Sequence, residues 1–204
     1  MARIRLTKNE LRDQQRKWQQ LQRYLPTLQL KKAMLQLEVN NVQIELENAL
    51  EKKEQKKEIV ERFSALLMEK VECNLTQYAE VVHVNKIYEN IAGVEIPGFQ
   101  SVEFKKADYS LFATPAWTDE ACKLLREYVS QKEEIVVILE KKRSLGKELR
   151  DVSIRVNLFE KVLIPRSLEN IKKIKIFLGD QQLMAIAQAK VAKAKIHRAK
   201  KYYR

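Results

Sequence analysis

The residue types that most often carry chemistry are few in this sequence and stand apart from one another. The chain has two histidines, His83 and His197, and two cysteines, Cys73 and Cys122. A metal site needs several Cys, His or acidic ligands at short spacings, and neither histidine lies in such a cluster. The sequence also has no Gly-rich phosphate loop and no nucleophile motif. We therefore expect no metal site, no cofactor, no direct small-molecule ligand and no catalytic residue, and thus a protein that is not an enzyme.

The cysteines and the N-terminus indicate where the chain works. Two cysteines in 204 residues suit a reducing cytosol better than a disulfide scaffold. Cys73 and Cys122 could be neighbours at a neck between helices, either as small core residues or, as a sharper hypothesis, as a redox switch. The N-terminal sequence lacks the apolar core of a signal peptide, and no apolar run is long enough to span a membrane. We expect a cytoplasmic protein without membrane insertion.

Positive charge is concentrated at both chain ends. The formal net charge is +12, of which residues 1–25 contribute +5 and residues 180–204 contribute +6. Such ends attract acidic partners. The basic tail, with Tyr202 and Tyr203 available for base stacking, could bind nucleic acid, although a solvated helix end is the simpler interpretation. The basic residues that we expect to contact an acidic partner are Arg12, Arg16, Lys190, Lys193, Lys195 and Arg198.

The elements that position these residues are predicted to be two long helices. Charged residues make up 32% of the chain, and 4 Gly and 4 Pro leave few points at which it can reverse. From about residue 11 to residue 82, apolar residues recur at alternating steps of three and four, which is the period of a coiled-coil seam. This first seam comprises Trp18, Leu21, Leu25, Leu28, Lys32, Leu35, Val39, Val42, Leu46, Ala49, Lys53, Lys56, Val60, Phe63 and Leu67.

A second seam begins near Trp117, with Thr118 as the expected N-cap. Its phase slips near Pro165, and Gly179 is a candidate helix end, after which an Ala-rich tail is again helix-like. Before the slip the seam comprises Leu124, Tyr128, Gln131, Ile135, Ile138, Lys142, Leu145, Leu149, Val152, Val156, Phe159 and Leu163. After the slip it continues through Leu168, Ile171, Ile174 and Leu178.

Residues 83–116 form a head with different composition. Val94 and Ile96, then Val102 and Phe104, alternate with polar residues on either side of Pro97-Gly98. This pattern predicts a short β-hairpin or a compact loop. The chain thus divides into a first long helix (1–82), the head (83–116) and a second long helix with a basic tail (117–204).

We expect the two helices to bury their seams against each other, giving an all-α antiparallel coiled-coil hairpin with a small β-hairpin between the helices. If Leu67 faces Leu124, then Pro26 faces Pro165, and two kinks lie at one level. This arrangement also brings both termini to one end, where the two basic segments would merge into a single tip.

Two motifs resemble a known family. Residues Arg155–Glu160 (RVNLFE), followed by Val162–Pro165 (VLIP), resemble the "R-V-N-A-L-E … I-P" signature of the D subunits of V/A-type ATPases, with Leu158 and Phe159 in place of Ala and Leu. Residues Glu89–Pro97 (ENIAGVEIP) are similar to the linker of the bacterial members. The matched motif positions are Arg155, Val156, Asn157, Pro165, Gly93 and Pro97.

A third stretch, Leu6–Leu11 (LTKNEL), stands where the family has its "T-K/R-x-E-L" start, so the resemblance covers nearly the whole chain. The resemblance implies a central-stalk rotor shaft. Its terminal end would enter the hexamer of catalytic A and B subunits, so that the basic residues named above contact that hexamer. The small F subunit of the stalk would bind beside the shaft, and the far end would meet the stalk subunit that caps the membrane ring, which turns with H⁺ or Na⁺ flow.

Three lysines interrupt the first seam, and one glycine interrupts the second helix. Lys32, Lys53 and Lys56 mark either the landing site of the small F subunit or a solvated break in the seam. Gly146 either permits close approach of a partner or is simply tolerated. The alternative to the rotor hypothesis is a cytosolic coiled-coil scaffold with a nucleic-acid-binding tip, which the resemblance disfavours.

Overall fold

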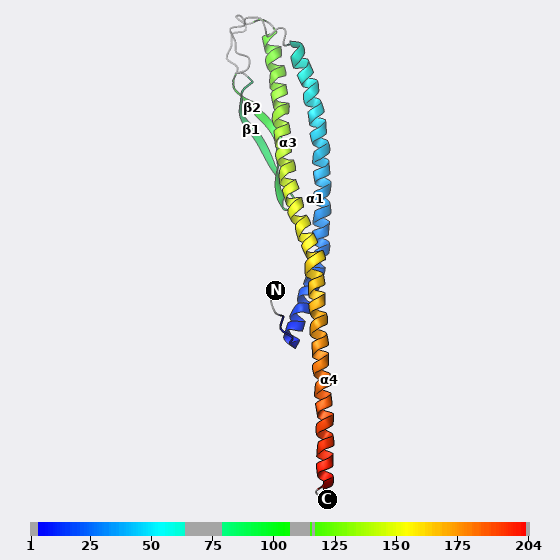
Figure 1. Ribbon diagram of the computed structural model, residues 1–204. Helices are drawn as coiled ribbons and strands as arrows, with labels where there is room; N and C mark the ends of the chain where they lie inside the picture. The colour runs from blue at the N-terminus through cyan, green and yellow to red at the C-terminus, as the bar shows by residue number, and fades with distance from the viewer. Residues whose placement is uncertain (1–3, 64–78, 107–114, 116, 203–204) are drawn as a thin grey trace. The chain divides into compact units, whose positions relative to one another are not determined.

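The structure of the chain is a computed structural model that describes residues 4–63, 79–106, 115 and 117–202 (Figure 1). Helices dominate it, and one pair of antiparallel strands lies between the long helices in sequence. In chain order the elements are α1 (Lys8–Phe63), β1 (Val81–Ile91), β2 (Val94–Phe104), α3 (Thr118–Leu158), the π-helical turn η2 (Phe159–Leu163) and α4 (Ile164–Tyr202).

The chain divides into two compact units. The central unit comprises residues 31–151 and therefore holds the β-hairpin and most of α3. The terminal unit comprises residues 1–30 and 152–204, and it holds the start of α1 together with η2 and α4. Each unit has its own buried core, so each is described separately below.

In the central unit, α1 and α3 pack antiparallel with their predicted seams facing each other. The predicted seam phase is confirmed, because every seam residue of this unit whose side chain is described is buried or half-buried. Burial of such aliphatic side chains is the main stabilising term for a helix pair. The predicted fold class, two long antiparallel helices with a two-stranded hairpin between them, is confirmed. The most completely buried apolar residues of this unit are Leu35, Val42, Ile96, Val137, Ile138 and Leu145.

The register of the two helices differs from the prediction. Lys31 Nζ lies 2.8 Å from Glu148 Oε1, whereas the predicted pairing puts Glu160 opposite Lys31. Lys141 Nζ lies 3.0 Å from Glu45 Oε2, whereas the predicted pairing puts Gly146 there. A heptad seam can slide by a whole repeat and keep its apolar contacts, so polar pairs such as these decide the register. Leu67, on which the prediction was anchored, lies outside the described residues.

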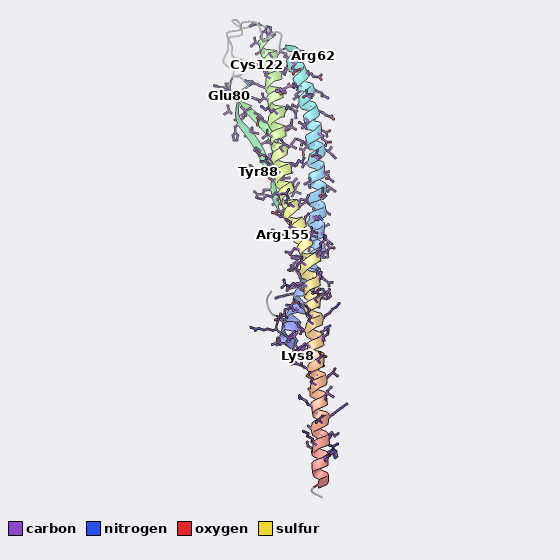
Figure 2. All side chains as sticks on the ribbon, in the orientation of Figure 1. Lys8, Arg62, Glu80, Tyr88, Cys122 and Arg155 are labelled. Atoms are coloured by element: carbon purple, nitrogen blue, oxygen red, sulfur yellow. The ribbon has the colours of Figure 1, made fainter. Side chains whose placement is uncertain are left out.

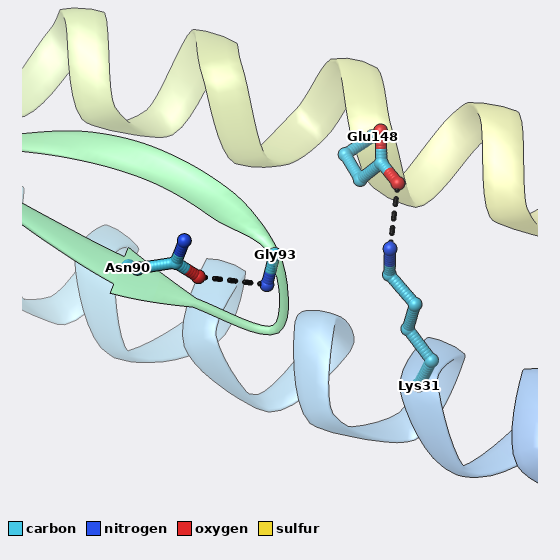
Figure 3. Close-up of polar contacts among 4 residues, drawn as sticks. All are labelled: Lys31, Asn90, Gly93 and Glu148. Atoms are coloured by element: carbon cyan, nitrogen blue, oxygen red, sulfur yellow. Dashed lines mark hydrogen bonds and ion pairs between the residues drawn. The ribbon is translucent and has the colours of Figure 1, made fainter.

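The hairpin turns at a different place from the one predicted. Its turn is Ala92-Gly93, with φ of +53° and +82°, and not Pro97-Gly98, which lies inside β2. Positive φ at both central residues is typical of the type I′ turn, whose twist matches that of paired strands. Asn90 Oδ1 accepts a hydrogen bond from the Gly93 N–H at 2.9 Å, beside the Lys31–Glu148 pair (Figure 3). The hairpin is therefore longer than the alternation pattern indicated.

The two long helices begin differently. At the start of α1, Thr7 Oγ1 accepts a hydrogen bond from the Glu10 N–H at 3.3 Å, which is an N-cap. Thr118 does not act in this way, because its side chain is buried and its Oγ1 has no hydrogen-bond partner. The prediction of Thr118 as an N-cap was therefore wrong. The Thr118 N–H instead donates to the Pro115 carbonyl at 3.0 Å.

In the terminal unit, the predicted phase slip near Pro165 is confirmed as the π-helical turn η2. The Ile164 N–H donates to the Phe159 carbonyl, five residues back. Proline has no N–H and its ring collides with the carbonyl four residues earlier, so one extra residue in the turn accommodates Pro165. The buried stripe then continues through Ser167, Asn170, Ile171 and Ile174. Leu168 is 37% exposed, so its predicted place in the seam was wrong.

The prolines of the terminal unit do not face each other. Residues 10–14 of α1 line one cleft together with residues 163–170, which places Pro165 close to Gln14 along the pair. Pro26 lies twelve residues further along α1, about 18 Å at the rise of an α-helix. The predicted pairing of the two kinks was therefore wrong, for the same reason as the register of the central unit.

The last part of α4 is not covered by other described residues of the chain. Gly179 does not end the helix, contrary to the prediction, because α4 runs unbroken to Tyr202. From residue 180 to residue 198 every side chain is exposed (Figure 2). We refer to residues 180–202 as the α4 tail. None of the described helices combines the length and the low polarity that a membrane span would need.

Candidate interaction surfaces

The predicted basic contact residues form two separate groups within the terminal unit. Arg12 and Arg16 are exposed on α1, and their neighbours Glu10 and Gln14 line a cleft with Asn170. Lys190 lies twenty residues beyond Asn170 on the same α-helix, about 30 Å along its axis. The structure therefore does not bring the two basic segments into one tip, as the sequence analysis expected. The charges that lie on the α4 tail are those of Lys190, Lys193, Lys195 and Arg198.

The α4 tail is apolar as well as basic, which the sequence analysis did not anticipate. Its large apolar side chains are 54–67% exposed, namely Leu183, Met184, Ile186, Val191 and Ile196. Small residues fill the spaces between them, with Ala185, Ala189 and Ala192 at helical spacing. At about 100° per residue these side chains are spread around the helix, with basic ones between them, and a helix that exposes apolar side chains on all sides is typically enclosed by other molecules. The sequence analysis noted the Ala-rich spacing but interpreted the tail from its charge, so it did not predict an exposed apolar surface.

The three seam lysines are half-buried, and all of them lie on the part of α1 that belongs to the central unit. Lys56 Nζ lies 3.7 Å from Glu127 Oε2 across the helix pair, and Lys32 and Lys53 line the seam at similar depth. Lys31, which the sequence analysis did not single out, makes the shorter ion pair with Glu148. These lysines therefore contribute their aliphatic stems to the seam and hold their charges at its edge.

Gly146 lies in a basic groove on the outer surface of α3. A side chain built on Gly146 would meet nothing within 4 Å, so the helix surface is open at this point. The groove has an apolar wall formed by Leu139, and Lys142 is tied to Gln43 of α1 by a hydrogen bond. The remaining lining residues are basic, namely Arg143, Lys147 and Arg150.

The β-hairpin is fixed to α3 by charged side chains. Lys86 Nζ donates a hydrogen bond to Glu140 Oε2 at 2.6 Å, and this bond raises the pKa of Lys86 above its usual value of 10.5. At the base of the hairpin, Arg126 donates to the Lys105 carbonyl at 3.0 Å and lies over the ring of Phe104. Three apolar side chains of β1 remain exposed, namely Val82, Ile87 and Tyr88, of which Tyr88 is labelled in Figure 2.

The cysteines and histidines form no site in the part of the chain that the structure describes. Cys122 is a free, buried thiol, and Cys73 lies outside the described residues, so their predicted proximity stays a prediction. His83 and His197 are exposed and lie in different units. Within the same described ranges, no group of three His, Cys, Asp or Glu side chains could hold a metal ion.

The motif positions lie at or near two irregular points of the backbone, the π-helical turn and the hairpin turn. Val156 is buried in the seam just before η2, whereas Arg155 and Asn157 are exposed, and Pro165 follows the π-helical turn. Gly93 provides the positive φ of the hairpin turn. Pro97 is buried in β2 opposite Tyr88.

Comparison with known proteins identifies this architecture. Residues 10–194 match the family model described as the D subunit of ATP synthase. The V-type ATP synthase D subunit of Chlamydia caviae is 41% identical over 200 residues, covering 98% of this chain and 96% of the relative. The corresponding protein of Borreliella burgdorferi is 40% identical over 196 residues, with 96% of each chain covered. The chain therefore belongs to the family of V-type ATP synthase D subunits, the non-catalytic central-stalk subunits of these rotary ATPases.

Proposed function

We propose that this chain is the rotor shaft that transmits rotation between a catalytic hexamer of A and B subunits and a membrane ring that translocates ions. A shaft must carry torque through its backbone, which requires continuous helices with few hinges. The helix α1 has 56 residues and α3 has 41, and α4 follows η2 without a loop. Neither helical glycine, Gly146 or Gly179, interrupts its helix. These features support a mechanical role.

The observation that carries the proposal is the uncovered α4 tail. A lone helix in water is marginally stable, and burial of an amphipathic face normally supplies the missing stability. The tail presents apolar side chains around its circumference, with basic side chains between them. We therefore assign the tail to the bore of the A/B hexamer, where acidic side chains would face Lys190, Lys193, Lys195 and Arg198. Arg12 and Arg16 would contact the hexamer separately.

Charge contacts suit a bearing that must turn. Surface ion pairs contribute only about 0–1 kcal/mol each, so a rotating tail can exchange one partner for the next. The two-helix arrangement also lacks threefold symmetry, so each of the three catalytic interfaces would meet a different face of the shaft. Apolar contacts of the tail would hold it on the axis while the charges are exchanged.

The remaining partners fit the central unit. We place the small F subunit of the stalk against the α1–α3 pair, with Lys32, Lys53 and Lys56 as candidate contacts. The stalk subunit that caps the membrane ring is placed at the head, residues 83–116. In this arrangement the chain works in the cytoplasm, peripheral to the membrane and bound to it only through the complex.

Reconstitution with A and B subunits tests the proposal. The full chain should bind the hexamer and change its ATPase rate, whereas a chain truncated after Gly179 should bind about tenfold more weakly or worse. A second variant, with Lys190, Lys193 and Lys195 changed to Gln, keeps the helix and removes three charges. Its matched control changes Lys52, Lys123 and Lys132, exposed lysines of the central unit, in the same way.

The expected result is weaker binding for the truncation and the tail variant, with the control unchanged. Circular dichroism should show that the truncated chain keeps the helicity of its remaining residues. Equal hexamer affinity and equal ATPase rates with and without the tail would overturn the assignment of the tail. An ATPase rate and hexamer assembly that ignore the full chain altogether would overturn the rotor proposal itself.

A further inference from the structure

The terminal unit contains a polar cleft that the proposed rotor function does not use. It lies between the N-terminal segment with the first turns of α1 and the segment around the start of α4, and it has a volume of about 420 Å³. All of its walls belong to the same unit. Its lining residues are Ile4, Arg5, Glu10, Gln14, Leu163, Arg166, Ser167 and Asn170.

Two polar side chains lie where the seam calls for apolar ones. Ser167 and Asn170 are each only 9% exposed, and they occupy the same buried stripe as Ile171 and Ile174. No hydrogen bond within the described residues uses either side chain. Among the described residues, the fully buried side-chain atoms without a partner are Trp18 Nε1 and Thr118 Oγ1, so the Ser167 hydroxyl and the Asn170 amide are not sealed off but reach solvent at the cleft. Both open into the cleft, where a ligand can satisfy them.

The charged side chains that line the cleft favour an anion that can also donate a hydrogen bond. Arg5 and Arg166 supply two guanidinium groups, which match phosphate oxygens through paired N–H donors. Glu10 is the only acid in the lining, and its Oε1 accepts a hydrogen bond from Gln14 Nε2 at 2.9 Å. A carboxylate repels a fully ionised anion such as sulfate. It accepts a hydrogen bond, however, from the P–OH group of a singly protonated phosphate.

We propose that this cleft binds phosphate, either inorganic phosphate or the terminal phosphate of a nucleotide. The guanidinium of Arg166, with that of Arg5, holds the phosphate oxygens. The Ser167 hydroxyl and the Asn170 amide donate to the same oxygens, and the free oxygen of Glu10 accepts the phosphate proton. Ile4 and Leu163 form apolar walls beside these bonds. The site is formed by this chain alone and does not depend on the rotor proposal.

Titration of the full chain with inorganic phosphate by calorimetry at fixed ionic strength tests the site. Wild-type chain should bind one phosphate, with sulfate at least about tenfold weaker. Arg166→Gln should weaken phosphate binding about tenfold or more. Glu10→Gln should remove the preference for phosphate over sulfate, because the amide no longer repels sulfate. A parallel titration with ATP distinguishes the two sources, since a nucleotide site binds ATP more tightly than phosphate.

Two further variants distinguish a specific phosphate site from nonspecific attraction of phosphate by positive charge. Lys175→Gln removes one exposed charge from α4 nine residues beyond Arg166, which is about half a turn away, on the opposite face of the helix. It should leave phosphate binding unchanged. Ser167→Ala places an apolar group in the seam, so the fold should keep or gain stability while phosphate affinity falls. Equal binding of phosphate and sulfate by wild-type chain, or equal losses in R166Q and K175Q, would overturn the proposal.

Discussion

The central unit and the α4 tail use similar residues for opposite purposes. In the central unit the aliphatic side chains of α1 and α3 face each other, and Leu35 and Leu145 are 0% exposed. In the tail, Leu183 is 67% exposed and Ile196 is 58% exposed. Both stretches are helical and charge-rich, so composition does not distinguish them. What differs is whether the chain itself supplies the opposite face.

This difference separates internal stability from recognition. In the central unit, the described part of the α1–α3 seam is covered within the chain, and ion pairs join the two helices at its edge. The tail exposes apolar side chains on all sides, and the surface that covers them has to come from another molecule. A mutation in the first region should therefore change the free energy of unfolding of the chain, and a mutation in the second should change binding.

The largest expected effect comes from emptying the core of the central unit. Leu145→Ala should lower the free energy of unfolding by about 2–5 kcal/mol, because it leaves a cavity in a fully buried site. Leu183→Ala should change it by less than about 0.5 kcal/mol, because that side chain is exposed. Urea denaturation followed by circular dichroism measures both. Similar losses of stability in the two variants would show that the tail is covered within the chain, and would contradict the difference between the central unit and the tail.

The two helix-interior prolines of the described residues, Pro26 and Pro165, allow a second test of stability. Both lie in the terminal unit. Pro26 is exposed inside α1 and costs one backbone hydrogen bond. Pro26→Ala should raise the free energy of unfolding by about 1–3 kcal/mol. Pro165→Ala should gain less, because η2 already accommodates the proline ring. Thermal unfolding of the two variants side by side tests this order, and a larger gain from Pro165→Ala would contradict it.

The sequence predicts which residues face the partner helix better than which residues they meet. Steps of three and four put Leu35, Val42 and Leu145 on buried faces, because helical geometry alone sets those positions. Register depends instead on pairs such as Lys31–Glu148, which a repeating seam leaves open. Because the predicted register was wrong, the prediction that the two basic chain ends meet was wrong as well.

The candidate sites show the same limit. Pro97-Gly98 is the stronger turn signal by composition, yet the turn forms at Ala92-Gly93, where Asn90 caps the backbone. The basic residues of the tail were identified from charge, but their setting among exposed apolar side chains required the burial of each residue. The cleft around Ser167 joins residues 4–14 to residues 163–170, which are far apart in the sequence, and no local pattern indicates it.

The hairpin turn permits a smaller test within the central unit. Gly93→Ala should destabilise the hairpin by about 1–2 kcal/mol, because an L-residue with a Cβ is strained at φ of +82°. The new methyl group would meet only Lys31 Nζ, at 4.0 Å, so backbone strain and not collision is the cause. Amide hydrogen exchange in β1 and β2 measures the effect. Ala92→Gly is the control and should slow that exchange or leave it unchanged, whereas faster exchange would argue against a type I′ turn.

The smallest expected effect is the pH dependence of the bond between the hairpin and α3. Hydrogen bonding to Glu140 raises the pKa of Lys86, so the pair stabilises the folded chain fully below the unfolded pKa of 10.5 and loses that contribution as pH rises through the higher folded pKa. The side chains are 26% and 46% exposed, which limits the effect to less than about 1 kcal/mol. Lys86→Gln should therefore lower the free energy of unfolding at pH 8, and the difference from wild type should vanish once pH exceeds that raised pKa. Lys105, whose Nζ lies 3.7 Å from Glu80 and is more exposed, provides the control, because Lys105→Gln should show almost no difference at either pH. A Lys86→Gln difference that persists in strong alkali would mean that the aliphatic stem of Lys86, and not its charge, holds the hairpin against α3.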